Sequence, residues 1–268
     1  MRCLNLGCGE RFHPEWVNLD LHPAKPSVRG WDLQEELPFA DGFFDVVYHS
    51  HVLEHFSKAE GLEFLKRCWR VLRPSGIIRV AVPDLEQIVR LYLEALDKSS
   101  AGDPIWQARY EWILLELYDQ AVRESSGGQM IEYVRRVPIP ERDFVASRIG
   151  GEFRRMTALA SKDTVQRSVK VSSKLRNLVS RKTARLALGE RGMRAHDAGA
   201  FRITGEVHRW MYDSYSLAHA LKQAGFRSSH KVEADESAIA GWSGFQLDTE
   251  PDGSVYKPDS LFMEAVRA

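Results

Sequence analysis

The sequence has few cysteines, no long apolar run and no net charge. Its three cysteines, Cys3, Cys8 and Cys68, are too few and too irregularly spaced for a disulfide framework or a zinc site. Thirty-seven basic residues balance thirty-seven acidic ones, and no hydrophobic stretch approaches the ~20 residues of a membrane span. No signal-peptide pattern opens the sequence. These absences favour a cytoplasmic protein without a transmembrane segment.

Aromatic residues are absent from the most basic stretch of the chain. Residues 154–194 hold twelve Lys or Arg against two acids, yet Thr157 to Arg194 contains no Phe, Tyr or Trp. Because single-stranded nucleic acids stack their bases on aromatic side chains, this composition disfavours a nucleic-acid partner. A phosphorylated small acceptor, peripheral contact with an anionic membrane surface and a solvated helix face all remain compatible with the charge.

A third glycine is missing from the loop after the first predicted strand. The strand Cys3–Leu6 leads into Gly7–Gly9 (GCG), but Phe12 stands where a dinucleotide-binding G-x-G-x-x-G loop needs glycine. A second strand, Trp16–Leu21, follows too soon for a helix, which disfavours a pyrophosphate at a helix N-terminus. Glycine still lets the backbone approach a ligand, and Asp20 on the second strand can accept both hydroxyls of a ribose. The stretch therefore predicts a nucleoside site.

Three motifs follow one another in an order that establishes a family resemblance. They are LNLGCG at residues 4–9, LPFADGFFDVVYHSHVLEH at 37–55 and LRPSG at 72–76. In these motifs the chain resembles the class I S-adenosylmethionine-dependent methyltransferases of the type 11 family, although Phe43 stands where that family often has serine. The resemblance implies an α/β, Rossmann-like sheet, mostly parallel with an antiparallel last strand, and S-adenosyl-L-methionine as the cofactor.

The expected cofactor-binding residues lie at the ends of the first four strands. Asp20 is expected to hold the ribose, and the resemblance places the adenine amino group near Asp32 and the backbone of the next residue. The full set is Leu6, Gly7, Cys8, Gly9, Asp20, Leu21, Asp32, Leu33, His49 and Ser50.

The pattern of apolar residues predicts two parts of the chain. Residues 1–94 and 206–268 are expected to form the Rossmann-like core, and residues 95–205 a helical insertion that covers the cofactor as a lid and binds the acceptor. The expected strands after the first two are 27–33, 43–48, 77–82, 227–233 and 260–267, and the expected helices are 57–72, 84–98, 105–121 and one capped by Asp213 or Ser214 and ended by Gly225.

Polar residues follow the fourth predicted strand. If a helix begins near residue 51, His51, Glu54 and His55 share one of its faces. Three roles stay open: a structural scaffold, a general base at His51 or His55, or a metal site resembling the E-x-x-E-H cluster of small-RNA 2′-O-methyltransferases. H-x-x-E-H is also an inverted zinc-protease motif, but here it follows a cofactor strand. No residue is assigned as a metal ligand.

A second polar group is the octet EVHRWMYD at residues 206–213. It resembles an element of bacterial methyltransferases associated with surface-polysaccharide genes, and His208, paired with Asp213, is the preferred candidate base, with Tyr212 as a further contact. The predicted reaction is O-methylation of a hydroxyl on a small or glycan-type acceptor, including anionic ones. N- or C-methylation of another metabolite, and an inactive cofactor-binding module, are the alternatives. The sequence does not predict an oligomeric state.

Overall fold

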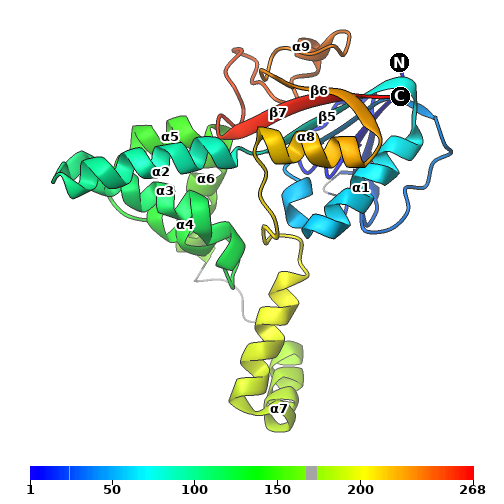
Figure 1. The fold of residues 1–268 in the computed structure, drawn as a ribbon. Helices are drawn as coiled ribbons and strands as arrows, with labels where there is room; N and C mark the ends of the chain where they lie inside the picture. The colour runs from blue at the N-terminus through cyan, green and yellow to red at the C-terminus, as the bar shows by residue number, and fades with distance from the viewer. Residues whose placement is uncertain (24, 167–173) are drawn as a thin grey trace. The chain divides into compact units, whose positions relative to one another are not determined.

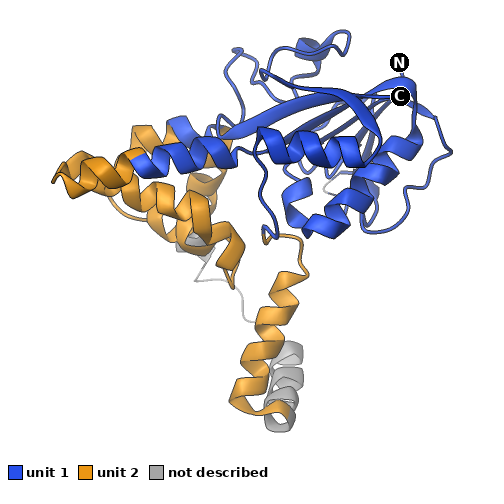
Figure 2. Ribbon diagram, in the orientation of Figure 1, with its two compact units in different colours: residues 1–93, 147–150, 208–268 blue, residues 94–146, 151–207 orange. Residues whose placement is uncertain are grey.

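The computed structural model describes residues 1–23, 25–166 and 174–268, with the side chains of 162–187 left out. The chain divides into two compact units (Figure 2). Residues 1–93, 147–150 and 208–268 form unit 1, and residues 94–146 and 151–207 form unit 2. Most of the basic stretch 154–194 therefore lies outside the described side chains.

Unit 1 is built on a seven-stranded sheet with the order β3-β2-β1-β4-β5-β7-β6. Neighbouring strands from β3 to β5 run parallel, whereas β7 is antiparallel to both β5 and β6. The strands are β1 (Cys3–Leu6), β2 (Val17–Asp20), β3 (Arg29–Gly30), β4 (Phe44–Ser50), β5 (Leu72–Pro83), β6 (Phe226–Val232) and β7 (Ser260–Arg267). This arrangement confirms the mostly parallel sheet with an antiparallel last strand that the sequence predicts.

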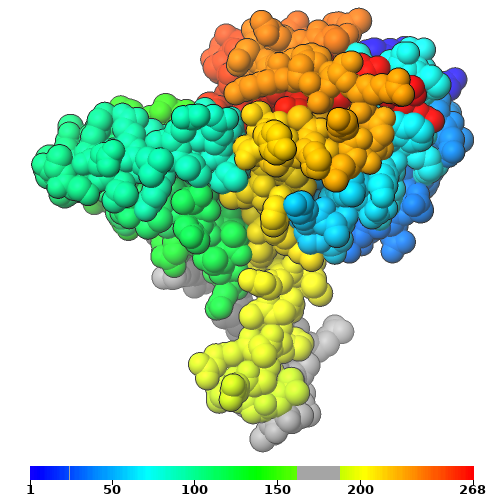
Figure 3. All heavy atoms as spheres, in the orientation of Figure 1, coloured from blue at the N-terminus to red at the C-terminus, as the bar shows by residue number. Residues whose placement is uncertain are grey.

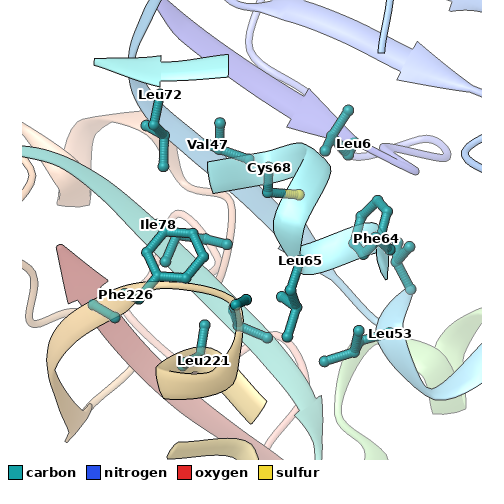
Figure 4. Packing of buried hydrophobic residues seen from close by; sticks show 14 of the residues in the cluster. Leu6, Val47, Leu53, Phe64, Leu65, Cys68, Leu72, Ile78, Leu221 and Phe226 are labelled. Atoms are coloured by element: carbon teal, nitrogen blue, oxygen red, sulfur yellow. The ribbon is translucent and has the colours of Figure 1, made fainter. Parts of the chain in front are cut away.

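One face of the sheet packs against two helices, α1 (Lys58–Val71) and α8 (Ser214–Gln223) (Figure 1). Alternate strand residues such as Leu6 and Val47 join Phe64 of α1 in one hydrophobic cluster (Figure 4). All three side chains are fully buried. Because burial of one such side chain stabilises a protein by about 1.5–3 kcal/mol, this layer contributes strongly to the stability of unit 1.

The opposite face is covered by the connection between β6 and β7, residues 233–259, which includes the short helix α9 (Trp242–Phe245). Trp242 and Leu247 of this connection pack with Trp16 and with Tyr48 of β4. The space-filling view shows the connection, in orange, lying over part of β7, in red (Figure 3). An irregular segment thus covers this face of the sheet, as α1 and α8 cover the first face.

Arg79 of β5 is buried beneath this connection and holds it in place. Its guanidinium donates to Asp248 (2.8 Å) and Glu264 (2.9 Å), and to main-chain carbonyls within residues 233–236 at 2.7–3.1 Å. The ring of Trp242 lies 4.2 Å from the guanidinium carbon. Two buried carboxylates therefore share one buried cation, whose donors also satisfy backbone acceptors.

The described residues between 85 and 202 form mainly helices, most of which belong to unit 2. They are α2 (Leu85–Ser100), α3 (Pro104–Val122), α4 (Gly128–Val134), α5 (Arg142–Ile149), α6 (Gly151–Gln166) and α7 (Lys174–Arg202). Buried Asp119 of α3 pairs with Arg123 and accepts the main-chain N–H of Gln129 at 2.6 Å, which fixes the turn before α4. Within the described ranges, no helix combines the length and the hydrophobicity needed to cross a bilayer.

The predicted elements of unit 1 agree with the structure except in two places. The strands Cys3–Leu6 and Ser260–Arg267 are confirmed to the residue, and α1 and α2 confirm the predicted helices 57–72 and 84–98. The strand predicted over residues 27–33 is wrong beyond Arg29–Gly30, because the chain turns where the carboxylate of Asp32 accepts the N–H of Gln34 at 2.9 Å. The second place is residue 51, where the sequence left a helix start open and where no α-helix begins, as shown below.

Candidate functional site

The loop after β1 contains two glycines: Gly7 is tightly packed, and Gly9 has open space beside it. Gly7 and Gly9 both have positive φ angles, +63° and +53°. A Cβ atom on Gly7 would lie 2.4 Å from Cγ2 of Val52, whereas a Cβ atom on Gly9 would have no neighbour within 4 Å. Gly7 therefore lets the chain pass close to the β4 side of the site, and Gly9 leaves open space beside the backbone.

The thiol of Cys8, between the two glycines, is buried, and burial raises its pKa to about 12. It stays protonated at neutral pH and offers no nucleophile.

Asp20 closes the same loop from the end of β2. Its two carboxylate oxygens accept the main-chain N–H of Gly9 and of His22, each at 2.8 Å. A carboxylate offers about four acceptor positions, so this one keeps capacity for the two hydroxyls of a ribose. Leu21, the next residue, is exposed.

Leu33 lies inside the site and Asp32 points away from the core. The Leu33 side chain would be 3.7 Å from a Cβ atom on Gly7, and its carbonyl accepts from Arg67 at 3.0 Å. Asp32 is exposed at the start of its turn. Leu6 and Leu33 are both buried members of the core cluster, and Leu33 brings apolar surface up to Gly7.

His49 is a core residue, and Ser50, which ends β4, is half-buried beside it. The imidazole of His49 packs edge-on against Phe64 at 5.1 Å, and neither of its nitrogens has a hydrogen-bond partner among the described residues. Burial lowers the pKa of His49 to about 3, so the ring is neutral at physiological pH. Its side chain packs with α1.

A one-turn 3-10 helix, η1 (Leu53–His55), replaces the predicted helix start at residue 51. His51 has a φ of +53°, and α1 begins only at Lys58, after the cap of Ser57. His51, Glu54 and His55 therefore do not share a helix face. A left-handed backbone at a non-glycine residue is not visible in a periodicity pattern, which is why the prediction failed.

Glu54 is the centre of the polar cluster that forms instead. Its side chain is fully buried, and burial raises the pKa of its carboxyl. Its main-chain carbonyl accepts the N–H of Arg209 (2.7 Å) and of Trp210 (3.1 Å), which fixes the octet segment against η1. As a result Nε2 of His208 lies 4.0 Å from Oε1 of Glu54.

Two more histidines border Glu54. The rings of His55 and His208 meet edge to face at 4.9 Å. Nδ1 of His51 lies 3.2 Å from Oε1 of Glu54, while its Nε2 lies 2.8 Å from Oγ of Ser260. The sequence grouped His51, Glu54 and His55, but it did not predict that His208 joins them.

The remaining octet residues support this arrangement. Asp213 is the N-cap of α8, because its carboxylate accepts the N–H of Ser216 at 2.7 Å in a capping box. Tyr212 is buried, and a Cβ atom on Gly61 would lie 2.9 Å from its hydroxyl. Burial, together with Glu54, raises the pKa of Tyr212 to about 12.

Sequence reasoning missed Arg11, which ties the glycine loop to the β6–β7 connection. Its Nε donates to the carbonyls of Gln246 and Leu247, both at 3.1 Å, and its guanidinium carbon lies 3.9 Å from the ring of Tyr256. These partners are far away in sequence, so no local pattern signals them.

The residues at this edge of the sheet fit S-adenosyl-L-methionine. Gly9 leaves the space that a side chain would fill, Asp20 keeps acceptor capacity for a ribose, and Leu33 adds apolar surface. These three contributions are those that a nucleoside with an exposed diol requires.

Comparison with known proteins identifies one matching family model. Residues 4–80 match the family model described as "Methyltransferase domain". No curated protein matches the chain.

Among solved structures, the chain is similar to an S-adenosylmethionine-dependent methyltransferase from Archaeoglobus fulgidus, with 13% identity, coverage of 99% and 86% of the two chains and a TM-score of 0.40. It is similar to a possible histamine N-methyltransferase from Thermotoga maritima at 10% identity, with coverage of 100% and 82% and a TM-score of 0.37. An amino pentose methyltransferase from Micromonospora echinaspora, solved with S-adenosylmethionine bound, matches at 25% identity over 30% of this chain and 41% of its own, with a TM-score of 0.24.

Proposed function

We propose that this chain, an S-adenosylmethionine-dependent methyltransferase whose residues 4–80 belong to the methyltransferase domain family, methylates a hydroxyl of a small or glycan-type acceptor. When bound, S-adenosyl-L-methionine supplies a methyl group activated by its sulfonium. Asp20 orients the ribose, Gly9 gives the ligand access to the backbone, and Leu33 excludes water from one side. The chain's remaining task is to hold the acceptor and remove its proton.

The polar cluster around Glu54 is the observation that supports a hydroxyl acceptor. Val52 packs on Gly7 of the cofactor loop; His51 directly precedes Val52 in the chain, and Glu54 follows it by two residues. A hydroxyl must lose its proton during methylation, whereas many carbon and nitrogen acceptors need less help. We assign His51 and His208 to contact with the acceptor hydroxyl, and Asp213 to fixing the segment that carries His208.

The insertion of residues 95–205 is proposed to bind the rest of the acceptor and to cover the cofactor. It lies in the chain between β5 and α8, and its basic stretch suits a sugar phosphate, a nucleotide sugar or a lipid-linked glycan. A nucleic-acid acceptor is disfavoured, because aromatic residues are absent from Thr157 to Arg194. A cytoplasmic location remains part of the proposal.

The test is the identity of the methylated atom. The protein is incubated with S-adenosyl-L-methionine labelled with ¹³C in its methyl group and with pools of sugar phosphates, nucleotide sugars and amino sugars. The proposal expects the labelled carbon of the product to have the NMR shift of a methyl ether. A product methylated on nitrogen or carbon contradicts it, and so does cofactor binding without any product, which would indicate an inactive module.

A further inference from the structure

Within the described part of the chain, the buried carboxylate of Glu54 has no hydrogen-bond donor to compensate for its loss of solvation. It is 0% exposed, and neither oxygen has a hydrogen-bond partner among the described residues. Nδ1 of His51 is 3.2 Å away, within ion-pair distance but without hydrogen-bond geometry. A buried carboxylate without donors is strongly unfavourable unless it takes up a proton or a cation lies beside it.

Two imidazoles stand where ligands to such a cation would stand. Glu54, His55 and His208 each offer one ligand atom, and these atoms lie within 4.8 Å of one another. Ligand atoms bound to one transition-metal ion at about 2.0–2.2 Å lie roughly 3–4 Å apart, so small side-chain rotations suffice to close the set. His55 is half-buried, whereas Glu54 and His208 are buried.

The surroundings also match those of a metal centre. His51 faces the Glu54 carboxylate on one ring nitrogen and Ser260 on the other, as an outer residue that orients a ligand does. The chain brings His208 to this point through the two backbone hydrogen bonds from Arg209 and Trp210 to the Glu54 carbonyl. We propose that Glu54, His55 and His208 bind one divalent transition-metal cation such as Zn²⁺ or Mn²⁺.

Two imidazoles and one carboxylate are ligands that such ions accept, and three protein ligands leave positions open for an oxygen ligand. The consequence for catalysis rests on the proposed function. Such a cation would make an acceptor hydroxyl bound to it more acidic, so that the hydroxyl proton would pass to water as the oxygen takes the methyl group from the sulfonium. His208 would then act on the acceptor hydroxyl through the cation, as its ligand, and not by direct contact.

The experiment measures metal binding without turnover. The full chain, freed of metal with a chelator, is titrated with Co²⁺, whose visible d–d absorption reports coordination by histidine and carboxylate. The wild-type protein is expected to bind one Co²⁺ per chain with a Kd of about 10 µM or tighter. Glu54→Gln and His208→Ala should each weaken binding at least about a hundredfold. His219→Ala, which removes an exposed histidine on α8, is the matched control and should bind normally.

Melting temperatures test both the folding of each variant and its binding of metal. Melting temperatures with and without Zn²⁺ show whether each variant folds, and Zn²⁺ should raise the melting temperature of the wild type and of His219→Ala only. Failure of the wild type to bind Co²⁺, or binding by Glu54→Gln as tight as that of the wild type, overturns the proposal.

The experiments distinguish failure of the proposed metal site from failure of the proposed function. A protein that makes a methyl ether after chelation and binds no Co²⁺ keeps the function and loses the metal site. A protein that binds Co²⁺ but methylates nitrogen or carbon keeps the metal site and loses the function.

Discussion

Asp20 shows how one carboxylate serves both the loop and the ligand. It accepts two main-chain N–H groups in the structure, and we propose that it also accepts the ribose hydroxyls. Asp20→Ala should weaken S-adenosylhomocysteine binding at least about tenfold, because each hydrogen bond to a charged group contributes about 1.5–3 kcal/mol. Isothermal calorimetry measures this. Glu10→Ala, which removes an exposed acid of the same loop, is the control, and an equal loss in both variants would contradict the prediction.

His49 predicts how stability depends on pH. Burial lowers its pKa from 6.5 to about 3, so between these values only the unfolded chain takes up the proton. The stability is therefore complete above pH 6.5 and falls as the pH is lowered, by up to about 1.4 kcal/mol per pH unit. His49→Phe should lose this part of the acid destabilisation. Urea unfolding at pH 7 and pH 5 measures it.

His219→Phe changes an exposed histidine and should keep the acid sensitivity of the wild type. An identical loss of stability on acidification in the wild type and in His49→Phe would show that His49 is not responsible.

For single residues, the sequence predicted the place in the fold better than it predicted the surroundings of the side chain. The motifs identified Gly7, Gly9 and Asp20, and the structure brings these three into one loop. The same motifs placed His49 among the cofactor residues, but its side chain is inside the core. Residue type and spacing indicate which strand end a residue occupies, whereas the side-chain direction depends on the register of the sheet.

Among elements, β5 carries the interaction that local sequence could least reveal. The run from Ile77 to Val82 correctly predicts a buried strand, yet the partners of its Arg79, Asp248 and Glu264, follow 169 and 185 residues later. The connection between β6 and β7, residues 233–259, has little regular structure, so no periodic pattern of apolar residues predicts it. Long-range pairing and irregular segments are the parts that a pattern of apolar residues does not encode.

The Arg79 interaction makes a prediction for this element. Arg79→Met should destabilise the protein by about 3–5 kcal/mol, because it leaves Asp248 and Glu264 as buried carboxylates without their cation. Arg73→Met is the control: Arg73 is 57% exposed where it pairs with Asp45, so its loss should cost at most about 1 kcal/mol. Denaturant midpoints compare the two, and equal shifts would refute the role of Arg79.

For the whole molecule, the net charge of zero conceals a separation of basic and acidic residues along the chain. The basic stretch 154–194 carries twelve Lys or Arg, and the rest of the chain is acidic. Arg191 and Arg194 of this stretch are described and exposed. If the stretch attracts an anionic acceptor, replacing both by Glu should raise the acceptor KM at least several-fold at low salt and less at high salt, with unchanged cofactor affinity.

Arg90→Glu reverses an exposed charge on α2 and should leave the acceptor KM nearly unchanged. Steady-state kinetics at two ionic strengths separate the variants. Equal KM values for the wild type and the double variant at low salt would indicate a merely solvated helix face.

The position of β7 determines when the molecule can fold. This strand lies between β5 and β6, although it is the last to be synthesised of the three. Until residues 260–267 have left the ribosome, β5 and β6 have no partner between them, and Arg79 lacks Glu264. The nascent chain therefore presents unpaired strand edges during most of its synthesis, which is a state prone to aggregation. Chaperone demand in the cell should accordingly depend on how quickly residues 260–267 are translated after β5.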